Sequence, residues 1–295
     1  MRSALAHSPL PTHGLDRHRA DHPRAAAIAA LAARSLLLEL ETWPKPGLVS
    51  HVDNGSHDDM DAALFRVSAQ AIRPYFGALA IAGAEGCGMG RLRIIGLEAE
   101  AAMMEATSGI NTHRGAIFGL GLLCAAAGAR AAGLTDAATP LGAVVTTRWG
   151  REIVNGPVLL NSHGERARRR YGSGGARMEA ALGFPSVYEI GLPALREAAL
   201  CAPHDDEAQR VAACLALIAA VEDTNLLHRG GPDGLHFARR AARRFLRDGG
   251  IGRPGWRDRA RAVHDSFVAR RLSPGGSADL LAMSLFVNAC EGGPL

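Results

Sequence analysis

The densest group of side chains able to do chemistry lies in residues 51–61, which hold four carboxylates and two histidines. Part of this group is typical of local structure. Asp-Asn-Gly at 53–55 predicts a turn, and Ser56 with Asp59 has the spacing of a helix capping box. Capping accounts for one or two of these aspartates and does not require four. A group of carboxylate oxygens suits Mg²⁺, which takes one or two carboxylates together with substrate phosphates. The cluster therefore predicts a metal-related role, with capping as the alternative.

Lys45 is the only lysine among the 33 basic residues of the chain, and it stands between Pro44 and Pro46. The two prolines restrict the backbone around it. A rigid loop that presents one ammonium group suits a phosphate. The alternative is an ordinary Pro-Gly turn with a solvated lysine. Glu41 precedes this loop and adds a carboxylate at the end of an expected helix.

A third polar cluster occupies residues 109–115. Asn111 or Thr112 is suited to cap the helix that follows. His113 and Arg114 would add hydrogen-bond donors at a helix N-terminus, which favours anions. Simple capping and anion binding explain this cluster equally well.

Two further clusters contain acids next to glycine. Residues 222–231 place an acidic pair where we expect an apolar helix to end, and the helix dipole disfavours acids there. A cation bound near Asp223 would offset that cost; a solvated helix end capped by asparagine is the alternative. Residues 273–279 combine a Pro-Gly-Gly turn with a Ser-capped helix, whose free N–H groups would hold phosphate oxygens.

The segment 161–178 holds five arginines beside Tyr171 and a glycine-rich run. We interpret it as a loop or lid that clamps phosphates, with a solvated basic loop as the alternative. A nucleic-acid site is disfavoured because one short patch gives a small electrostatic footprint.

The polar clusters lie at the ends of expected helices. Ala/Leu-rich periodicity predicts helices over 24–41, 58–84, 91–107, 114–132, 139–154, 187–200, 205–226, 234–248, 256–271 and 277–290. Pro74 predicts a kink or break in the second of them. No period-two alternation predicts a strand. We therefore expect an all-α fold: a flexible tail over 1–23, then one compact multi-helix domain of about ten helices over 24–295.

The composition excludes several classes of protein. Hydrophobic residues make up 47% and charged residues 21%, which permits a large core and is unlike a disordered chain. The net charge of +4 suits phosphorylated substrates but is weak ground for nucleic-acid binding. Five cysteines without a CxxC pair indicate free thiols, and no apolar run reaches membrane-spanning length, so we expect a cytoplasmic protein. Walker A, HExxH and GxSxG patterns do not occur.

Four motifs together closely resemble the triphosphoribosyl-dephospho-CoA synthase family: TWPKPGLVSHVDNGSHDDMD, GINTHRGAIFGLGLL, EDTNLLHRGG and SPGGSADLLA. The resemblance covers residues 41–282. The family serves malonate decarboxylase or citrate lyase, and this chain is more similar to the malonate decarboxylase branch. Arg114 stands where many relatives have lysine, and Asp58 where a basic or variable residue is expected, which weakens Asp58 as a ligand.

The resemblance implies an enzyme that moves the 5-triphosphoribosyl group of ATP to the ribose 2′-hydroxyl of 3′-dephospho-CoA and releases adenine. The product, 2′-(5″-triphosphoribosyl)-3′-dephospho-CoA, is the precursor of an acyl-carrier prosthetic group and passes to a holo-carrier-protein transferase. Mg²⁺ is the implied cofactor, with ATP as a substrate; neither nucleic acid nor a membrane is an expected partner. The chemistry needs a base for the attacking hydroxyl, an acid for adenine and exclusion of water.

Motif position and chemical type assign the site residues that the resemblance implies. The catalytic candidates are Asp53, Asp59, Asp223, His57 and Glu41. The substrate-binding candidates are Lys45, Asn54, Ser56, Asn111, Thr112, His113, Arg114, Asn225, His228, Arg229, Gly275, Gly276 and Ser277. The metal candidates are Asp53, Asp59, Asp61, Asp223 and Asp279.

Two other functions remain open from the sequence. A metal-dependent ADP-ribosyl or nucleoside hydrolase on an all-α fold would also use carboxylate-rich helix ends to cleave an N-glycosidic bond. A helical interaction module would bind no nucleotide, and it would leave the polar clusters without a purpose.

Overall fold

A computed structural model describes residues 23–157, 170 and 174–292, and these residues form a single all-α domain, as expected from the sequence. The described part contains no strand. Its helices are α1 (Pro23–Leu40), α2 (Ala62–Ala84), α3 (Met89–Ala106), α4 (Arg114–Ala131), α5 (Leu141–Asn155), α7 (Gly175–Ala181), α8 (Leu192–Cys201), α9 (Asp206–Ala220), α10 (Thr224–Arg247), α11 (Trp256–Val268) and α12 (Gly275–Cys290). A π-helical turn, Val187–Gly191, precedes α8, and a short 3₁₀ turn, Gly250–Gly252, precedes α11.

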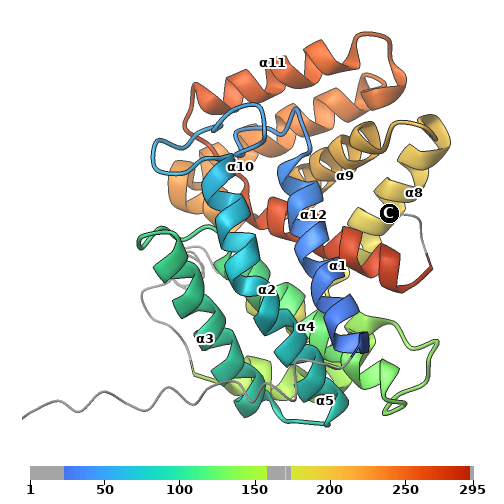
Figure 1. The fold of residues 1–295 in the computed structure, drawn as a ribbon. Coiled ribbons are helices and arrows are strands. Elements are labelled where there is room, and N and C mark those ends of the chain that lie inside the picture. The colour runs from blue at the N-terminus through green and yellow to red at the C-terminus, as the bar shows by residue number, and fades with distance from the viewer. Residues whose placement is uncertain (1–22, 158–169, 171–173, 293–295) are drawn as a thin grey trace, which may run out of the picture.

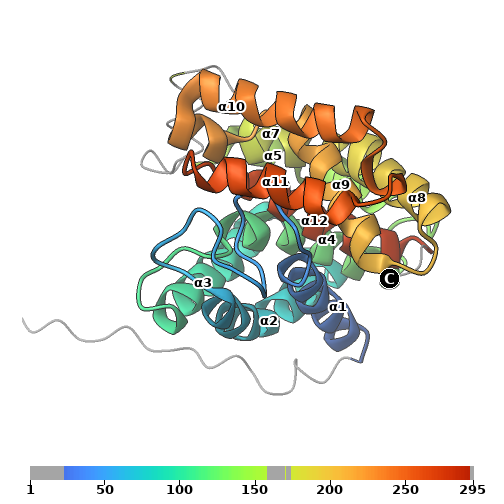
Figure 2. The ribbon, with the colours of Figure 1, turned by 90° about the horizontal axis from the view of Figure 1, so that it is seen from above.

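Helices α4 and α12 form the centre of the fold. They lie between α1–α3 on one side and α8–α11 on the other (Figures 1 and 2). Both central helices are apolar around most of their circumference, as a helix enclosed by neighbours must be. Burial of this apolar surface is the main driving force for the fold.

Helices α2 and α4 pack closely, because two glycines allow backbone to meet backbone. A Cβ atom added to Gly83 would lie 1.9 Å from the carbonyl oxygen of Ala125. A Cβ atom added to Gly128 would lie 1.9 Å from the carbonyl oxygen of Ala80. The two helices therefore cross at a separation that no larger side chain permits at these points.

Three expected helix boundaries are wrong. The helix expected over 234–248 is part of α10, which begins at Thr224. The helix expected over 205–226 ends at Ala220, and a new helix begins at Thr224 because Asp223 caps it. The helix expected from residue 58 begins at Ala62, because Asp61 accepts a hydrogen bond from the backbone N–H of Leu64.

Proline and glycine act differently in two long helices. α2 continues through Pro74, so the expected break does not occur. α10 continues to Arg247 but bends at Gly231, whose φ is 61° and which directly precedes a proline. This bend separates the cavity-facing first turns of α10 from its arginine-rich second half.

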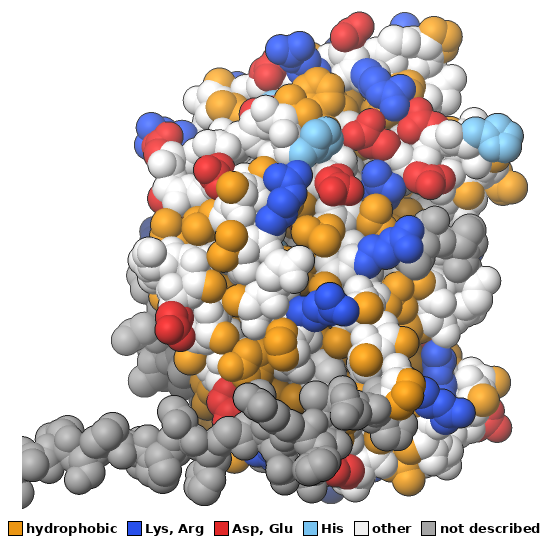
Figure 3. All heavy atoms as spheres, viewed as in Figure 1, with side chains coloured by type: hydrophobic (Ala, Val, Ile, Leu, Met, Phe, Trp, Pro, Cys, Tyr) orange, Lys and Arg blue, Asp and Glu red, His pale blue; other side chains and the backbone are white. Residues whose placement is uncertain are grey.

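The five cysteines are free, as expected. Within the described residues, none of the helices taken singly has the length and apolarity to cross a membrane, although α9 and α10 meet that criterion as a pair bent by 59°. The tail expected over 1–23 lies outside the described residues except for its last residue, which begins α1. On the face shown in Figure 3, charged side chains of both signs gather in the upper part, and hydrophobic ones are frequent below them.

Candidate functional site

A cavity of about 1310 Å³ lies among α1–α4, α7, α10 and α12. The N-termini of α4, α10 and α12 reach it, together with the end of α1, the loop before α2, α3 and α7. Many of the residues expected at the site line it: His57, Asp59, Asn111, Thr112, His113, Arg114, Asp223, Asn225, His228, Arg229, Gly275, Gly276 and Asp279. Motifs far apart in the sequence therefore meet around one space.

Other expected site residues do not line the cavity: Glu41, Lys45, Asp53, Asn54, Ser56, Asp61 and Ser277. Glu41 is exposed, one residue beyond the end of α1. Asp61 is exposed and serves as the N-cap of α2. Ser56 is not the expected N-cap, since its hydroxyl donates to the carbonyl of Leu272 at 2.7 Å.

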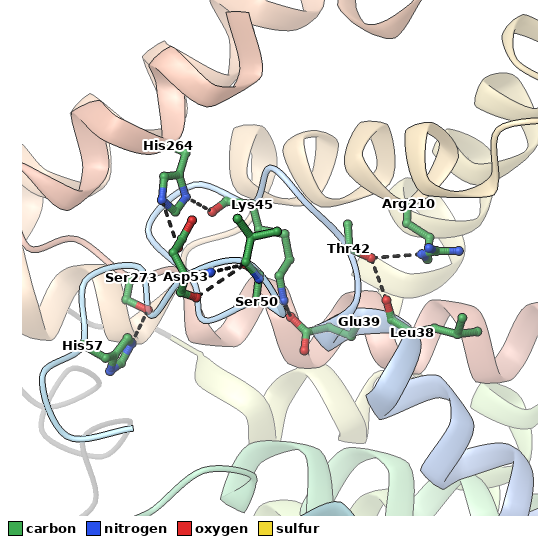
Figure 4. Close-up of polar contacts among 11 residues, drawn as sticks. Leu38, Glu39, Thr42, Lys45, Ser50, Asp53, His57, Arg210, His264 and Ser273 are labelled. Atoms are coloured by element: carbon green, nitrogen blue, oxygen red, sulfur yellow. Dashed lines mark hydrogen bonds and ion pairs between the residues drawn. The ribbon is translucent and has the colours of Figure 1, made fainter. Parts of the chain in front are cut away.

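The loop after α1 holds Lys45 inside the protein. Its side chain is fully buried and forms an ion pair with Glu39 of α1 (Figure 4), so the loop does not present an ammonium group to solvent. The backbone carbonyl of Lys45 accepts a hydrogen bond from Nδ1 of His264 at 2.6 Å. The sequence interpretation of Lys45 as an exposed phosphate ligand is replaced by a buried pair.

Asp53 stabilises the neighbouring turn. Its Oδ2 accepts from Nε1 of Trp43 at 3.0 Å, and its Oδ1 accepts from the backbone N–H of Gly55 at 2.9 Å. Nε2 of His264 lies 3.2 Å from the same Oδ1 (Figure 4). The first two contacts lie within the loop between α1 and α2, and the third joins this loop to α11. Asp53 does not line the cavity, so it is placed to hold the loop.

His57 and Arg229 form a polar group at the cavity. Nη2 of Arg229 lies 3.1 Å from Nδ1 of His57, and Nε2 of His57 lies 2.9 Å from the hydroxyl of Ser273. Burial and then the charge of Arg229 lower the pKa of His57, which outweighs the opposite effect of Asp59 at 3.6 Å. The pair therefore supplies one cation beside an imidazole that tends to be neutral.

Asp223 joins two helix N-termini. Its Oδ1 accepts from the backbone N–H groups of Asn225 and Leu226, and its Oδ2 accepts from the backbone N–H and the hydroxyl of Ser277. The expectation that this acid closes an apolar helix is wrong, since it begins one, where the dipole favours an anion. Burial raises its pKa, and the four hydrogen bonds oppose that shift.

The same contacts correct the interpretation of the turn before α12. The helix begins at Gly275, so Ser277 lies inside its first turn and is not its cap. The backbone N–H of Ser277 is 2.7 Å from Asp223, and it is therefore not free for a phosphate. The N-terminus of α12 already has a carboxylate partner.

His113 belongs to a buried hydroxyl network on the α2 side of the cavity. Its Nδ1 lies 2.7 Å from the hydroxyl of Ser68, which also accepts from Thr112 at 2.7 Å. Burial first, and then the charge of Lys45, lower the pKa of His113 to about 3. The imidazole is neutral at physiological pH, so imidazolium acid catalysis is not open to it.

Asn111 and Arg114 lie at the start of α4. Oδ1 of Asn111 accepts from the backbone N–H of Arg114 at 3.1 Å, in the first turn of α4. The guanidinium of Arg114 lines the cavity and pairs with Glu100 at 2.9 Å.

Asp279 lies against the start of α4. A Cβ atom on Gly115 would come within 2.0 Å of Oδ2 of Asp279, so only glycine allows this approach. The carboxylate accepts the backbone N–H of Ala116. Burial, and then the charges of Glu39 and Asp223, hold the pKa of Asp279 well above its usual range.

Sequence reasoning missed Glu39, Ser68, Glu100 and His264. Only Glu39 had a signal: it lies on the buried face of α1 with Leu36 and Leu40, at a position where the helical period predicts an apolar residue. The other three are ordinary polar residues whose partners come from distant segments.

The expected metal site is not formed by side chains alone. In the described part of the chain, no three or more His, Cys, Asp or Glu residues are grouped to hold a metal ion. Of the five metal candidates, only Asp59, Asp223 and Asp279 line the cavity.

The lid interpretation of 161–178 falls mostly outside the described residues. Within the described part, Arg177 donates to four backbone carbonyls, of Ile153, Val154, Gly156 and Pro157, at the end of α5. Arg177 thus caps a helix C-terminus and is not held ready for a phosphate.

Comparison with known proteins identifies the family. The model of the ATP:dephospho-CoA triphosphoribosyl transferase family matches residues 25–294. The chain belongs to this family. A probable 2-(5''-triphosphoribosyl)-3'-dephosphocoenzyme-A synthase of Stutzerimonas stutzeri is 40% identical over 273 residues, which cover 90% of this chain and 91% of the relative. The synthase of Pectobacterium atrosepticum is 41% identical over 265 residues, which cover 85% of each chain.

The family match confirms the resemblance inferred from the four motifs. A probable synthase of Acinetobacter calcoaceticus is 37% identical over 272 residues, which cover 90% of this chain and 92% of the relative. No solved structure matches the chain. The names of these relatives do not distinguish the malonate decarboxylase branch from the citrate lyase branch.

Proposed function

We propose that this protein transfers the 5-triphosphoribosyl group of ATP to the ribose 2′-hydroxyl of 3′-dephospho-CoA and releases adenine. The observation that carries the proposal is that the motifs shared with the family converge on one cavity of about 1310 Å³. That volume exceeds the range of roughly 300–1,000 Å³ usual for one small ligand, which suits a reaction of two nucleotides.

The polar residues at the cavity have distinct parts in this proposal. Arg229 and Arg114 supply fixed positive charge for the triphosphate. His57 lies beside Arg229 and adds a hydrogen-bonding group. Apolar side chains of α3, α4 and α7 cover the remaining wall and exclude water, so that ATP is not simply hydrolysed.

Mg²⁺ is part of the proposal as the partner of the triphosphate. Asp59 is the candidate ligand that fits, because it lines the cavity and its side chain is 62% exposed. Asp53, Asp61 and Asp223 are engaged with donors of the protein. When bound, Mg²⁺ would offset the charge of the triphosphate, with one protein carboxylate and phosphate oxygens as ligands.

Removal of divalent ions should abolish turnover. Without Mg²⁺ the triphosphate charge has only the few cationic side chains of the cavity to offset it. We expect adenine release in excess EDTA to fall to background and to return on addition of MgCl₂. Far-ultraviolet circular dichroism should not change, because the ion holds substrate and not the fold. Full activity in EDTA would contradict this part of the proposal.

The deciding experiment follows adenine by chromatography with purified protein, ATP and Mg²⁺, with and without 3′-dephospho-CoA. We expect adenine only when the acceptor is present, together with a product heavier by one triphosphoribosyl group. Adenine without acceptor would instead indicate a nucleoside hydrolase. No adenine from folded protein would reject both reactions.

We further propose that the product is destined for the acyl carrier of malonate decarboxylase, by way of a holo-carrier-protein transferase. The similarity of the motifs to that branch supports this assignment over citrate lyase. Incubating the product with such a transferase and each apo-carrier tests it, since the preferred carrier should gain the prosthetic group faster.

A further inference from the structure

The cavity holds more carboxylates than the transfer reaction needs, and most of them already have partners. Asp223 accepts four hydrogen bonds, and Asp279 is held by the first turn of α4. Glu100 pairs with a guanidinium at 2.9 Å. Glu179 accepts the backbone N–H and the hydroxyl of Ser186 at 2.7 and 3.0 Å. These four acids are engaged in holding the protein together.

Two further cavity acids are open to water. The side chain of Asp59 is 62% exposed, and Glu222 is also exposed. A base in contact with bulk water would activate water as readily as a sugar hydroxyl. Neither position therefore suits a transfer from which hydrolysis is excluded.

Glu39 is the remaining cavity acid, and its environment differs from all the others. Its side chain is 7% exposed, and its Oε1 is held by the fully buried ammonium of Lys45. Its Oε2 has no hydrogen-bond partner among the residues that the structure describes. Figure 4 shows the lysine reaching from the loop after α1 to this carboxylate at the end of the helix.

We propose that Glu39 is the general base of the transfer, with Oε2 accepting the proton of the attacking 2′-hydroxyl. Lys45 is its positioning residue, because the ion pair holds Oε1 of a side chain that lines the cavity and leaves Oε2 without a partner among the described residues. This inference rests on the proposed function. The only lysine of the chain then acts through a glutamate and not on a phosphate.

The proposed step balances in atoms and electrons. The 2′-oxygen of the acceptor forms a bond to C1′ of the ATP ribose, while the C1′–N9 bond breaks. The hydroxyl proton moves to Oε2 of Glu39. Adenine leaves with the electron pair of the broken bond and takes one proton from solvent, and Glu39 later returns its proton to solvent.

The test compares Glu39→Gln with the wild type in the adenine assay. We expect kcat to fall at least ~100-fold, as for loss of a general base. KM for ATP and for dephospho-CoA should stay within about 3-fold, since glutamine keeps the shape of the side chain. Glu39→Asp keeps a carboxylate and should be faster than Glu39→Gln. Glu197→Gln, on an exposed face of α8 away from the cavity, is the matched control with wild-type kcat.

A second variant guards against misfolding. Glu39→Gln leaves a buried ammonium without its partner, which by itself destabilises a protein. The double variant Glu39→Gln/Lys45→Met removes both charges, and we expect it to fold and to be as slow as Glu39→Gln. A folded single or double variant with kcat within about 3-fold of wild type would overturn the inference. So would a loss confined to KM, which would assign Glu39 to binding.

The outcome separates the inference from the function on which it rests. Product from the wild type together with normal kcat in Glu39→Gln would overturn only the role of Glu39. Absence of product from folded wild-type protein would overturn both.

Discussion

Asp223→Ala is expected to lose both stability and activity. The substitution removes the N-cap of α10 and leaves the buried backbone N–H of Ser277 without an acceptor. A lost cap and an unsatisfied buried donor together cost about 3 kcal/mol. Turnover should fall at least ~10²-fold, because Asn225 and Gly276 at the cavity wall are positioned by this carboxylate, and small displacements are costly in catalysis.

Chemical denaturation and the adenine assay measure the two effects of Asp223→Ala. Asp205→Ala is the matched control, because Asp205 is also an N-cap, of α9, and accepts from the backbone N–H of Ala208 at 2.9 Å. It lies away from the cavity, caps only one helix and otherwise forms a partly exposed ion pair with Arg257, which contributes little. We therefore expect a loss of about 1 kcal/mol and normal turnover. Equal stability losses in the two variants would argue against the bridging role of Asp223.

Gly128→Ala is expected to lower the stability of the fold as strongly as Asp223→Ala, although neither Gly128 nor its contact Ala80 lines the cavity. The added methyl would lie 1.9 Å from the backbone carbonyl oxygen of Ala80, and a backbone atom cannot move aside by rotating. Helices α2 and α4 must separate, which costs about 3 kcal/mol by the usual scale of overpacking. A fall in Tm of roughly 5–10 °C follows. Gly83→Ala, at the reciprocal contact with Ala125, should behave in the same way.

Gly77→Ala is the matched control on the same helix as Gly83. Its added methyl would meet the nearest atom, Cβ of Ala29, at an ordinary 3.6 Å. Because alanine is the better helix former, this variant should gain up to about 1 kcal/mol. Thermal unfolding followed at 222 nm compares the three variants. Similar Tm values for Gly77→Ala and Gly128→Ala would contradict the close crossing of α2 and α4.

Most helices were predictable from the sequence because periodicity is a local property. The failures occurred where a side chain caps a backbone. Asp61 caps α2, whereas the sequence predicted Ser56 as the cap. Asp223 caps α10, whereas the sequence predicted one helix that continued to residue 226. A cap depends on one hydrogen bond between neighbouring residues, and several nearby residues have the chemistry to form it.

The candidate site was predictable to the level of segments. The polar clusters at 51–61, 109–115, 222–231 and 273–279 all contribute to one cavity. Within them the sequence did not separate Asp59, which lines that cavity, from Asp53, which holds a turn. Both are aspartates in one motif, and only the direction of each side chain distinguishes them.

The sequence by itself determined the helical class, through its apolar period, and the family, through four long motifs. Only the tertiary structure decided which carboxylates accept hydrogen bonds from the protein and that, within the described part of the chain, Oε2 of Glu39 does not. Asp223 accepts hydrogen bonds from Ser277, 54 positions away. The backbone carbonyl of Lys45 accepts one from His264, 219 positions away. Such partners meet only after the helices pack, because a hydrogen bond depends on distance in space and not on separation along the chain.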